Sequence, residues 1–217
     1  MELARPTTLA LVVALAACGD DPAMTAVTGQ QLLDDCAGTF DVSEVAVPAT
    51  FRVDGSRLVM RGDFVDETSQ TLFTLLDQNP AIRTLVLAFV GGADVSEEGN
   101  LTAGREIRRR GLGTCVPEGG LVASGGTDFL LGGEQRAVLA NARVGVHSWA
   151  GDDGNGMEIQ ANQIPRDSAE HAPFLSYYRD VGISEDFYWF TLDAAAPDDM
   201  YYMSRAELAA FSVYTIE

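Results

Sequence analysis

Two residues that could carry out covalent catalysis follow apolar segments in the second half of the chain. Ser124 comes after the run Leu-Val-Ala and precedes two glycines, which places it on a bend before a short apolar helix. His147 ends the apolar segment RVGV. A serine hydroxyl becomes a nucleophile when an adjacent base accepts its proton and backbone amides stabilise the developing oxyanion. The amides after Ser124, from Gly125 onward, and the Gly91-Gly92 pair that ends an earlier apolar run are candidate donors.

The choice of base is narrow, because the chain contains no lysine and only two histidines, His147 and His171. A Ser-Lys dyad is therefore excluded. His147 ends a predicted strand, and ligand sites of α/β sheets gather at the carboxyl ends of their strands. We expect His171 to be a structural histidine. The alternative for Ser124 is a turn residue without a catalytic role, since serine beside glycine is common at ordinary turns.

The elements that must position Ser124 and His147 alternate between strands and helices. The continuous apolar run 82–90 is typical of a buried parallel strand, and the segment 96–111 has the acids and arginines of a helix at the ends that its dipole favours. This alternation predicts an α/β fold with a largely parallel sheet and right-handed crossovers. The strands are expected over 57–65, 82–90, 113–117, 120–124 and 143–149, and the helices over 66–80, 96–111 and 125–133.

The segment after Trp149 has a different character. Residues 151–163 are polar and glycine-rich, which predicts a loop, and their acids lack the spacing of a calcium-binding loop, so we expect no metal. Residues 166–192 are expected to be helical. A serine followed three residues later by a glutamate predicts the start of a helix over 204–211, and a last strand is expected over 212–216.

The order of these landmarks from residue 57 to residue 149, and more weakly from 197 to 211, resembles that of the Clp-type serine peptidases and their periplasmic relatives. The shared order is a strand, a helix, a strand ending in Gly-Gly, a helix, a strand, a serine turn, a helix and a strand ending in histidine. The resemblance implies the Clp/crotonase fold, which is an α/β fold of repeated β-β-α units with a mostly parallel central sheet.

The same resemblance assigns roles to individual residues. It implies that Ser124 is the nucleophile, that His147 is the general base, and that the backbone amides of Gly92 and Gly125 form the oxyanion hole. The implied activity is that of a serine hydrolase, most simply a peptidase with a peptide or protein substrate. No metal and no organic cofactor is implied.

The third member of such a triad is an acid ahead of a late helix. The segment APDDMYYMSRAEL resembles that part of the family and offers Asp199 as the first choice and Asp198 as the second. Taken alone, the two aspartates would be a solvated pair before a helix.

Three departures from the family pattern support a different function. Phe89-Val90 stands where Ser-Pro precedes the Gly-Gly, Gly125 replaces a larger residue after the serine, and Ser148-Trp149 replaces Gln-Pro after the histidine. The alternative is a catalytically degenerate, Clp-like binding or structural module. A crotonase-like enzyme acting on thioesters is a third hypothesis, against which the acidic composition and the predicted secretion argue.

The N-terminus predicts export and a lipid anchor. Residues 8–17 form an apolar run that is too short for a bilayer span but has the length of a signal-peptide core, with Arg5 before it. The run ends in Leu-Ala-Ala-Cys, which resembles a bacterial lipobox with Cys18 as the lipidated residue; Gly19 after it favours the outer membrane. The alternatives are an ordinary secretory signal or a fortuitous apolar start. We expect a signal peptide over 1–17, a tether and lead-in over 18–50, and the Clp/crotonase-like domain over 51–217, facing the periplasm.

The composition limits the partners. The net charge is −18, with 32 acidic and 14 basic residues, so the chain should repel nucleic acid and anionic lipid surfaces. Cys36 and Cys115 either pair as a disulfide in an oxidising compartment or remain two separate buried thiols. Clp-type peptidases assemble into rings, which raises a homo-oligomer as a further expectation, although a tethered lipoprotein need not form one.

Overall fold

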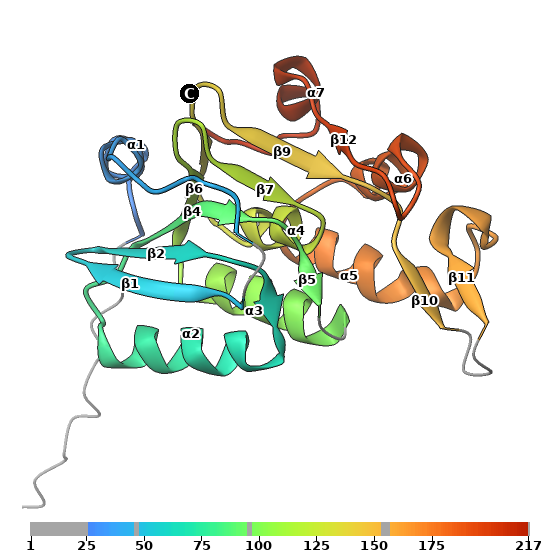
Figure 1. The fold of residues 1–217 in the computed structure, drawn as a ribbon, viewed down its shortest axis with the longest axis horizontal. Coiled ribbons are helices and arrows are strands. Elements are labelled where there is room, and N and C mark those ends of the chain that lie inside the picture. The colour runs from blue at the N-terminus through green and yellow to red at the C-terminus, as the bar shows by residue number, and fades with distance from the viewer. Residues whose placement is uncertain (1–25, 46–47, 95–96, 153–156, 217) are drawn as a thin grey trace, which may run out of the picture.

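The computed structural model describes residues 26–45, 48–94, 97–152 and 157–216. The predicted signal segment and Cys18 lie outside the described residues, as do Asp153 and Asn155 of the polar segment. Strands and helices alternate along most of the chain (Figure 1), which confirms the predicted α/β class with a mostly parallel sheet. Among the described residues, no helix is both long and apolar enough to cross a bilayer.

The strands are short. They are β1 (Thr50–Asp54), β2 (Arg57–Arg61), β3 (Phe64–Val65), β4 (Thr84–Val90), β5 (Ala93–Asp94), β6 (Gly113–Val116), β7 (Leu121–Ala123), β8 (Arg136–Val138), β9 (Arg143–Val146), β10 (Ala150–Asp152), β11 (Glu158–Gln160) and β12 (Tyr201–Tyr202).

Eight of these strands form the central sheet of the described chain, in the order β1-β2-β4-β7-β9-β12, with β6 and β8 branching from β4. The pairs β2–β4, β4–β6, β4–β7, β6–β8 and β7–β9 are parallel, and the outer pairs β1–β2 and β9–β12 are antiparallel. The first half of β4 pairs with β6 and its last two residues pair with β7, so the sheet divides along this strand. The succession β6, β7, α4 is one β-β-α unit of the predicted kind.

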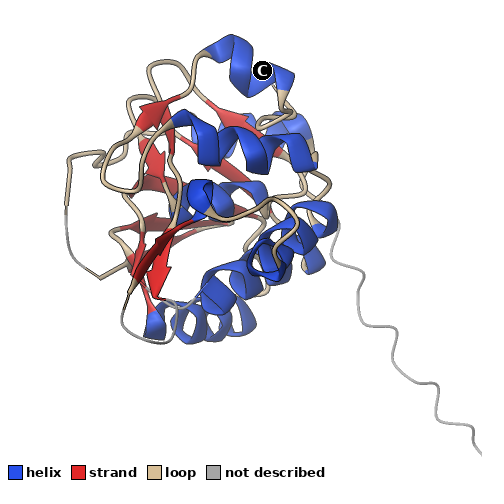
Figure 2. Ribbon diagram, turned by 90° about the vertical axis from the view of Figure 1, so that its right-hand side faces the viewer, coloured by secondary structure: helices blue, strands red, loops and turns tan. Residues whose placement is uncertain are grey.

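Helices surround the sheet unequally. They are α1 (Gly29–Cys36), α2 (Asp66–Gln78), α3 (Glu97–Arg109), α4 (Gly125–Leu131), α5 (Ala172–Asp180), α6 (Glu185–Ala194) and α7 (Arg205–Ala210), with short 3-10 turns at Ala161–Gln163 and Ala169–His171. Seen from the side, most helices gather on one side of the strands (Figure 2).

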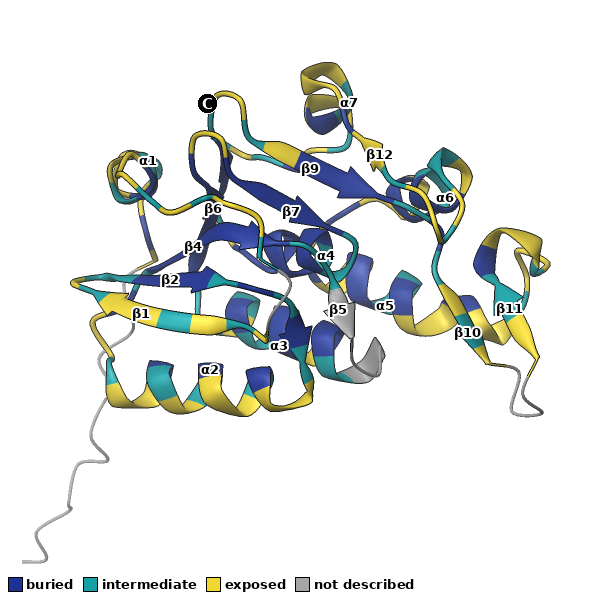
Figure 3. Cartoon of the chain, in the orientation of Figure 1, coloured by how far each residue is buried: buried dark blue, intermediate teal, exposed yellow. Residues whose placement is uncertain are grey.

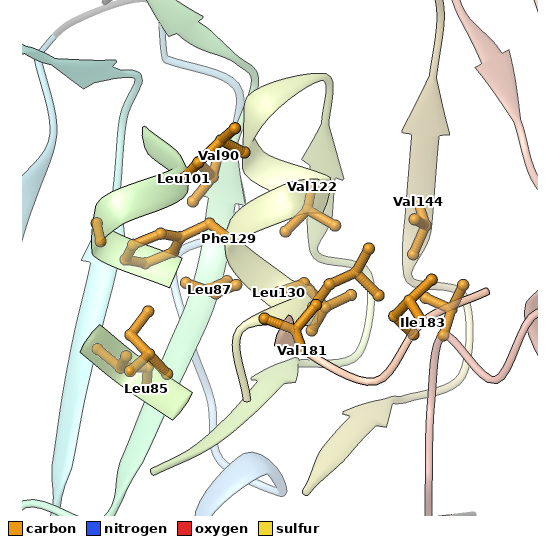
Figure 4. Close-up of a cluster of buried hydrophobic side chains, with 14 of the residues drawn as sticks. Leu85, Leu87, Val90, Leu101, Val122, Phe129, Leu130, Val144, Val181 and Ile183 are labelled. Atoms are coloured by element: carbon orange, nitrogen blue, oxygen red, sulfur yellow. The ribbon is translucent and has the colours of Figure 1, made fainter. Parts of the chain in front are cut away.

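Alternation along the strands explains this arrangement. Leu58 and Met60 of β2 belong to the large core that contains α2 to α6, whereas Val59 between them belongs to a smaller cluster with Leu32 of α1 on the opposite face. All seven residues of β4 are buried, as expected for a strand covered on both faces. Figure 3 shows the buried centre of the sheet and the more exposed β1 at its edge, and Figure 4 shows Phe129 and Leu130 of α4 among the side chains of that core.

A disulfide links two members of the smaller cluster. Cys36 at the end of α1 and Cys115 in β6 are bonded, with their Cα atoms 6.1 Å apart, and both residues are fully buried. Of the two alternatives for these cysteines, a disulfide or two separate buried thiols, the structure has the disulfide.

The C-terminal third departs from several sequence expectations. Part of the predicted loop 151–163 forms the hairpin β10–β11, because polar residues suit a two-stranded ribbon that has solvent around it. The predicted helix 166–192 is divided at Gly182, whose φ of 74° ends α5. The expected strand 212–216 is wrong: that segment makes a single bridge, between Ala137 and Ile216. The capping box at Ser204 and Glu207 is confirmed.

Candidate active site

Ser124 lies on a strained turn between β7 and α4. Its φ of 53° and ψ of −130° are unusual for a residue with a side chain and cost about 1–3 kcal/mol. Three hydrogen bonds hold the turn: Ser124 N–H donates to Gly145 O (3.1 Å), Thr127 N–H donates to Ser124 O (2.8 Å), and the Thr127 hydroxyl donates to Gly145 O (2.7 Å). The turn therefore presents the Ser124 side chain at the end of the strand.

The glycines around this turn allow a close approach of backbones. A methyl group at Gly126 would lie 2.5 Å from the carbonyl oxygen of Val90, and one at Gly145 would lie 2.7 Å from Sδ of Met200. The first turn of α4 is thus pressed against the end of β4. The second glycine after the serine has a packing reason that the sequence did not reveal.

His147 faces Ser124 across the two neighbouring strands. β7 and β9 are parallel and Ala123 pairs with Gly145, so the residues that follow these strands emerge at the same edge of the sheet. His147 Nε2 lies 2.7 Å from Ser124 Oγ, within hydrogen-bond distance, and the ring is half-buried. The structure thus brings together the predicted nucleophile and the predicted base, 23 residues apart in sequence.

The surroundings of His147 favour its neutral form. Burial lowers the pKa of His147 below the usual 6.5, while the nearby backbone carbonyls of Pro197 and Ser148 act in the opposite direction. A histidine that is neutral at pH 7 can accept a proton, which is the state a general base requires.

The expected third member of a triad does not reach His147. The Nδ1 atom of His147 is buried and has no hydrogen-bond partner in the part of the chain that the structure describes, although the Pro197 carbonyl lies near the ring. Asp198 and Asp199 are both exposed, and the Asp199 carboxylate accepts the N–H of Met200 at 2.7 Å. A turn in which Asp199 N–H donates to Ala196 O directs both carboxylates toward solvent. The expectation that an aspartate orients the imidazole is corrected accordingly.

The two predicted oxyanion donors flank Ser124. A methyl group at Gly92 would lie 3.8 Å from Ser124 Cβ, so the ends of β4 and β7 meet here. The carbonyl of Gly92 accepts the Phe64 N–H at 3.0 Å, and the carbonyl of Gly125 accepts the side-chain amide of Asn100 at 3.1 Å. These bonds fix the peptide groups that follow the two N–H groups, and the peptide that carries the Gly125 N–H is held by the bond from Thr127 N–H to Ser124 O. No described backbone carbonyl accepts the N–H of either glycine. Asn100 is buried and was not identified from the sequence, where a lone asparagine in a helix carries no signal.

A cavity of about 60 Å³ opens beside Ser124 and His147. Aromatic side chains from α5, α6 and the end of β9 form much of its wall, and Asp128 is the acidic residue that lines it. The sequence analysis did not single out Asp128, although its place four residues after Ser124 in a predicted helix put it one turn away on the same face. The aromatic wall residues are Trp149, Phe174, Tyr178, Phe187 and Tyr188.

His171 is part of the packing behind this wall, as expected for a structural histidine. It is fully buried, its Nδ1 lies 2.7 Å from the hydroxyl of Tyr188, and its ring packs edge-on against Trp189. Among the described residues, no group of three or more His, Cys, Asp or Glu side chains is arranged to hold a metal ion.

No protein-family model matches the chain, and no curated protein matches its sequence. Solved structures with a similar arrangement include a mutant of the membrane-bound stomatin-specific protease 1510-N in complex with a substrate peptide, at 15% identity over 71% of this chain and 74% of that chain, with a TM-score of 0.45. An enoyl-CoA hydratase from Mycobacterium marinum matches at 14% identity over 79% and 77%, with a TM-score of 0.45. A methylmalonyl-CoA decarboxylase matches at 11% identity over 80% and 68%, with a TM-score of 0.49. These structures differ in activity among themselves, so the chemistry of this chain has to be argued from its own site.

Proposed function

We propose that the protein is a serine hydrolase, most specifically a peptidase, that uses a Ser124–His147 dyad. The observation that carries the proposal is the 2.7 Å contact between Ser124 Oγ and His147 Nε2 at the edge of the sheet. Ser124 Oγ would attack the carbonyl carbon of an amide or ester while His147 Nε2 takes its proton. The protonated imidazole would then give that proton to the leaving amine or alcohol, and water would release the acyl group by the reverse sequence.

The backbone supplies the remaining parts. The amides of Gly92 and Gly125 flank the nucleophile, the carbonyls of the same two residues are held by Phe64 and Asn100, and the Ser124–Gly125 peptide is held by the N–H of Thr127. Donors fixed in this way stabilise a developing oxyanion without reorganisation, a contribution of about 3–4 kcal/mol for one such donor. We infer that the neutral state of His147 comes from burial, and its orientation from packing and the backbone around Pro197, without a carboxylate.

One observation favours a second candidate, the catalytically degenerate binding module. Among the described residues, His147 Nδ1 has no hydrogen-bond acceptor, so no carboxylate bonded there stabilises the imidazolium that the first step would form. A binding module on this fold would keep the cavity and have no need of an activated serine.

Labelling with a fluorophosphonate probe separates the two candidates. The purified protein without residues 1–17 is treated with the probe, and the modified residue is identified by mass spectrometry. We expect modification at Ser124, and at least about a hundredfold slower modification in His147→Ala. Ser56→Ala, in the turn between β1 and β2, is the matched control and should label like the wild type. A folded wild-type protein that is not labelled would contradict the hydrolase and favour the binding module.

We also propose that the protein is anchored by lipid at Cys18 and faces the periplasm, with the outer membrane favoured. The lipobox-like segment is the basis, and the Cys36–Cys115 disulfide supports an oxidising compartment. Growth of the expressing bacterium with an alkyne-bearing fatty acid should label the wild type and leave Cys18→Ser unlabelled. Equal labelling of both would refute the anchor.

A further inference from the structure

The cavity beside Ser124 combines aromatic walls with an acidic residue. Asp128 lines it together with Trp149, Phe174, Tyr178 and Tyr188. A cavity built only to hold an apolar side chain has no need of a carboxylate, whose burial costs free energy unless it is hydrogen-bonded or paired. The question is therefore which group of a ligand the Asp128 carboxylate binds.

The Asp128 carboxylate is held in place from α5. The hydroxyl of Tyr178 donates to Asp128 Oδ1 at 2.6 Å, and the hydroxyl of Tyr177 donates to the Asp128 backbone carbonyl. Both tyrosines are almost completely buried. Tyr178 thus fixes the orientation of a carboxylate that lines the cavity, and a carboxylate has the capacity to accept several hydrogen bonds.

The aromatic walls suit the apolar part of a basic side chain. Trp149 and Phe174 are stacked with ring centroids 5.6 Å apart, and Phe174 and Tyr188 are stacked at 5.4 Å. Rings of this kind pack against the methylene groups of a lysyl or arginyl side chain, whose charged group is left for the carboxylate of Asp128.

The position of Asp128 fits the side chain next to a scissile bond. Asp128 lies one helical turn after Ser124, about 6 Å farther along the axis of α4, which is comparable with the length of an extended lysyl side chain. The cavity of about 60 Å³ has room for roughly four to six waters. A narrow linear side chain fits that space better than a second aromatic ring.

The net charge of the whole protein also favours basic substrates. The net charge is −18, so a basic peptide is attracted toward the surface and an acidic one is repelled. This long-range attraction does not select a residue, but it raises the local concentration of basic substrates.

We propose that this cavity is the specificity pocket of the enzyme and that Asp128 selects a lysyl or arginyl side chain adjacent to the bond that is cleaved. This inference rests on the proposed function, because it assigns a substrate class to the same site. In this role Asp128 binds substrate and takes no part in proton transfer.

The test compares substrates that differ only in charge. Fluorogenic peptides carry lysine, norleucine or phenylalanine before the scissile bond, and norleucine is the uncharged analogue closest to lysine in shape. We expect kcat/KM for lysine to exceed that for norleucine at least about tenfold. Asp128→Asn should bring the ratio close to one, whereas Asp34→Asn, an equal change of charge at an exposed site on α1, should leave the ratio as in the wild type. Wild-type preference for norleucine or phenylalanine would overturn the proposal without any variant.

A binding measurement separates failure of the pocket from failure of the catalytic proposal. Fluorophosphonate labelling reports on the Ser124–His147 dyad, whatever the substrate preference. In parallel, the lysine and norleucine peptides are titrated into Ser124→Ala by calorimetry. If labelling fails but lysine binds at least about tenfold more tightly, the hydrolase is refuted and the cationic pocket stands. If labelling succeeds but both peptides bind and react equally, the pocket is refuted and the hydrolase stands.

Discussion

The carboxylate of Asp199 accepts a hydrogen bond from the backbone N–H of Met200 at 2.7 Å, and among the described residues no group hydrogen-bonds Nδ1 of the His147 imidazole. In a Ser-His-Asp triad that nitrogen donates to the aspartate, which holds the tautomer and stabilises the imidazolium. Here the Asp199 carboxylate instead accepts a hydrogen bond within the turn to which Asp199 belongs. In the proposed dyad, the backbone around Pro197 therefore stands where a triad has its acid.

Replacement of Asp199 by asparagine should therefore change catalysis little. We expect kcat/KM to stay within about threefold of the wild-type value, because the side chain that is altered does not contact the imidazole. Loss of a genuine triad aspartate lowers kcat by about 10⁴-fold. Asp198→Asn is the matched control at the adjacent exposed position. A drop on the order of 10⁴-fold in Asp199→Asn alone would show that the turn rearranges during catalysis.

The pH dependence of the reaction should report the environment of His147. Burial lowers the pKa of this histidine from 6.5, so the imidazole stays neutral, and able to accept a proton, to a lower pH than a free histidine. We expect the rate constant of fluorophosphonate labelling to fall on acidification with a midpoint below 6.5. A midpoint above 6.5 would contradict the role of burial.

The same shift has a consequence for stability. The unfolded chain binds a proton at His147 at a higher pH than the folded chain does, so acidification below about 6.5 favours unfolding. The contribution of His147 to stability is therefore present at neutral pH and is lost as the pH falls. Urea unfolding of the wild type and of His147→Gln at neutral and mildly acidic pH measures it, since the variant should lose less stability on acidification.

The serine turn should not tolerate a side chain at Gly126. An added methyl group would lie 2.5 Å from the Val90 carbonyl oxygen and 2.9 Å from Val90 Cγ1, and the central strand cannot move away without disturbing the core. We expect Gly126→Ala to lower the free energy of unfolding by about 1–3 kcal/mol and to slow labelling of Ser124 strongly. Gly151→Ala, where the nearest atom would be 3.7 Å away, is the control and should do neither. Wild-type labelling in a stable Gly126→Ala protein would show that the turn is less tightly determined than its contacts indicate.

The disulfide should contribute a large share of the stability. It closes a chain segment with a sequence separation of 79 residues, so reduction should lower the free energy of unfolding by about 4 kcal/mol. Urea unfolding with and without a reductant measures the difference. The double variant Cys36→Ala, Cys115→Ala should resemble the reduced protein and become insensitive to reductant. An unchanged midpoint on reduction would refute this contribution.

Local patterns in the sequence were sufficient for the elements that depend on neighbouring residues. The apolar run 82–90 contains β4, the charged segment 96–111 contains α3, and Ser204 with Glu207 begins α7. The meeting of Ser124 and His147 was also predictable, because both follow parallel strands and such ends share an edge. For the three elements the physical cause, hydrophobic periodicity or a local cap, lies within a few residues.

Other features depend on segments that are distant in sequence and meet only through packing. Tyr178 reaches Asp128 from 50 residues away because α5 packs against α3, which packs against α4, and no local pattern records which side chains meet there. The turn after Pro197 directs Asp199 away from His147, although the composition of that segment suggested a triad. The sequence by itself thus determined the fold class and the proximity of Ser124 and His147, since both follow from the order of strands and turns. The orientation of Asp199 and the place of Asp128 in the cavity wall were decided by the relative placement of helices and turns, which depends on the packing of the whole core.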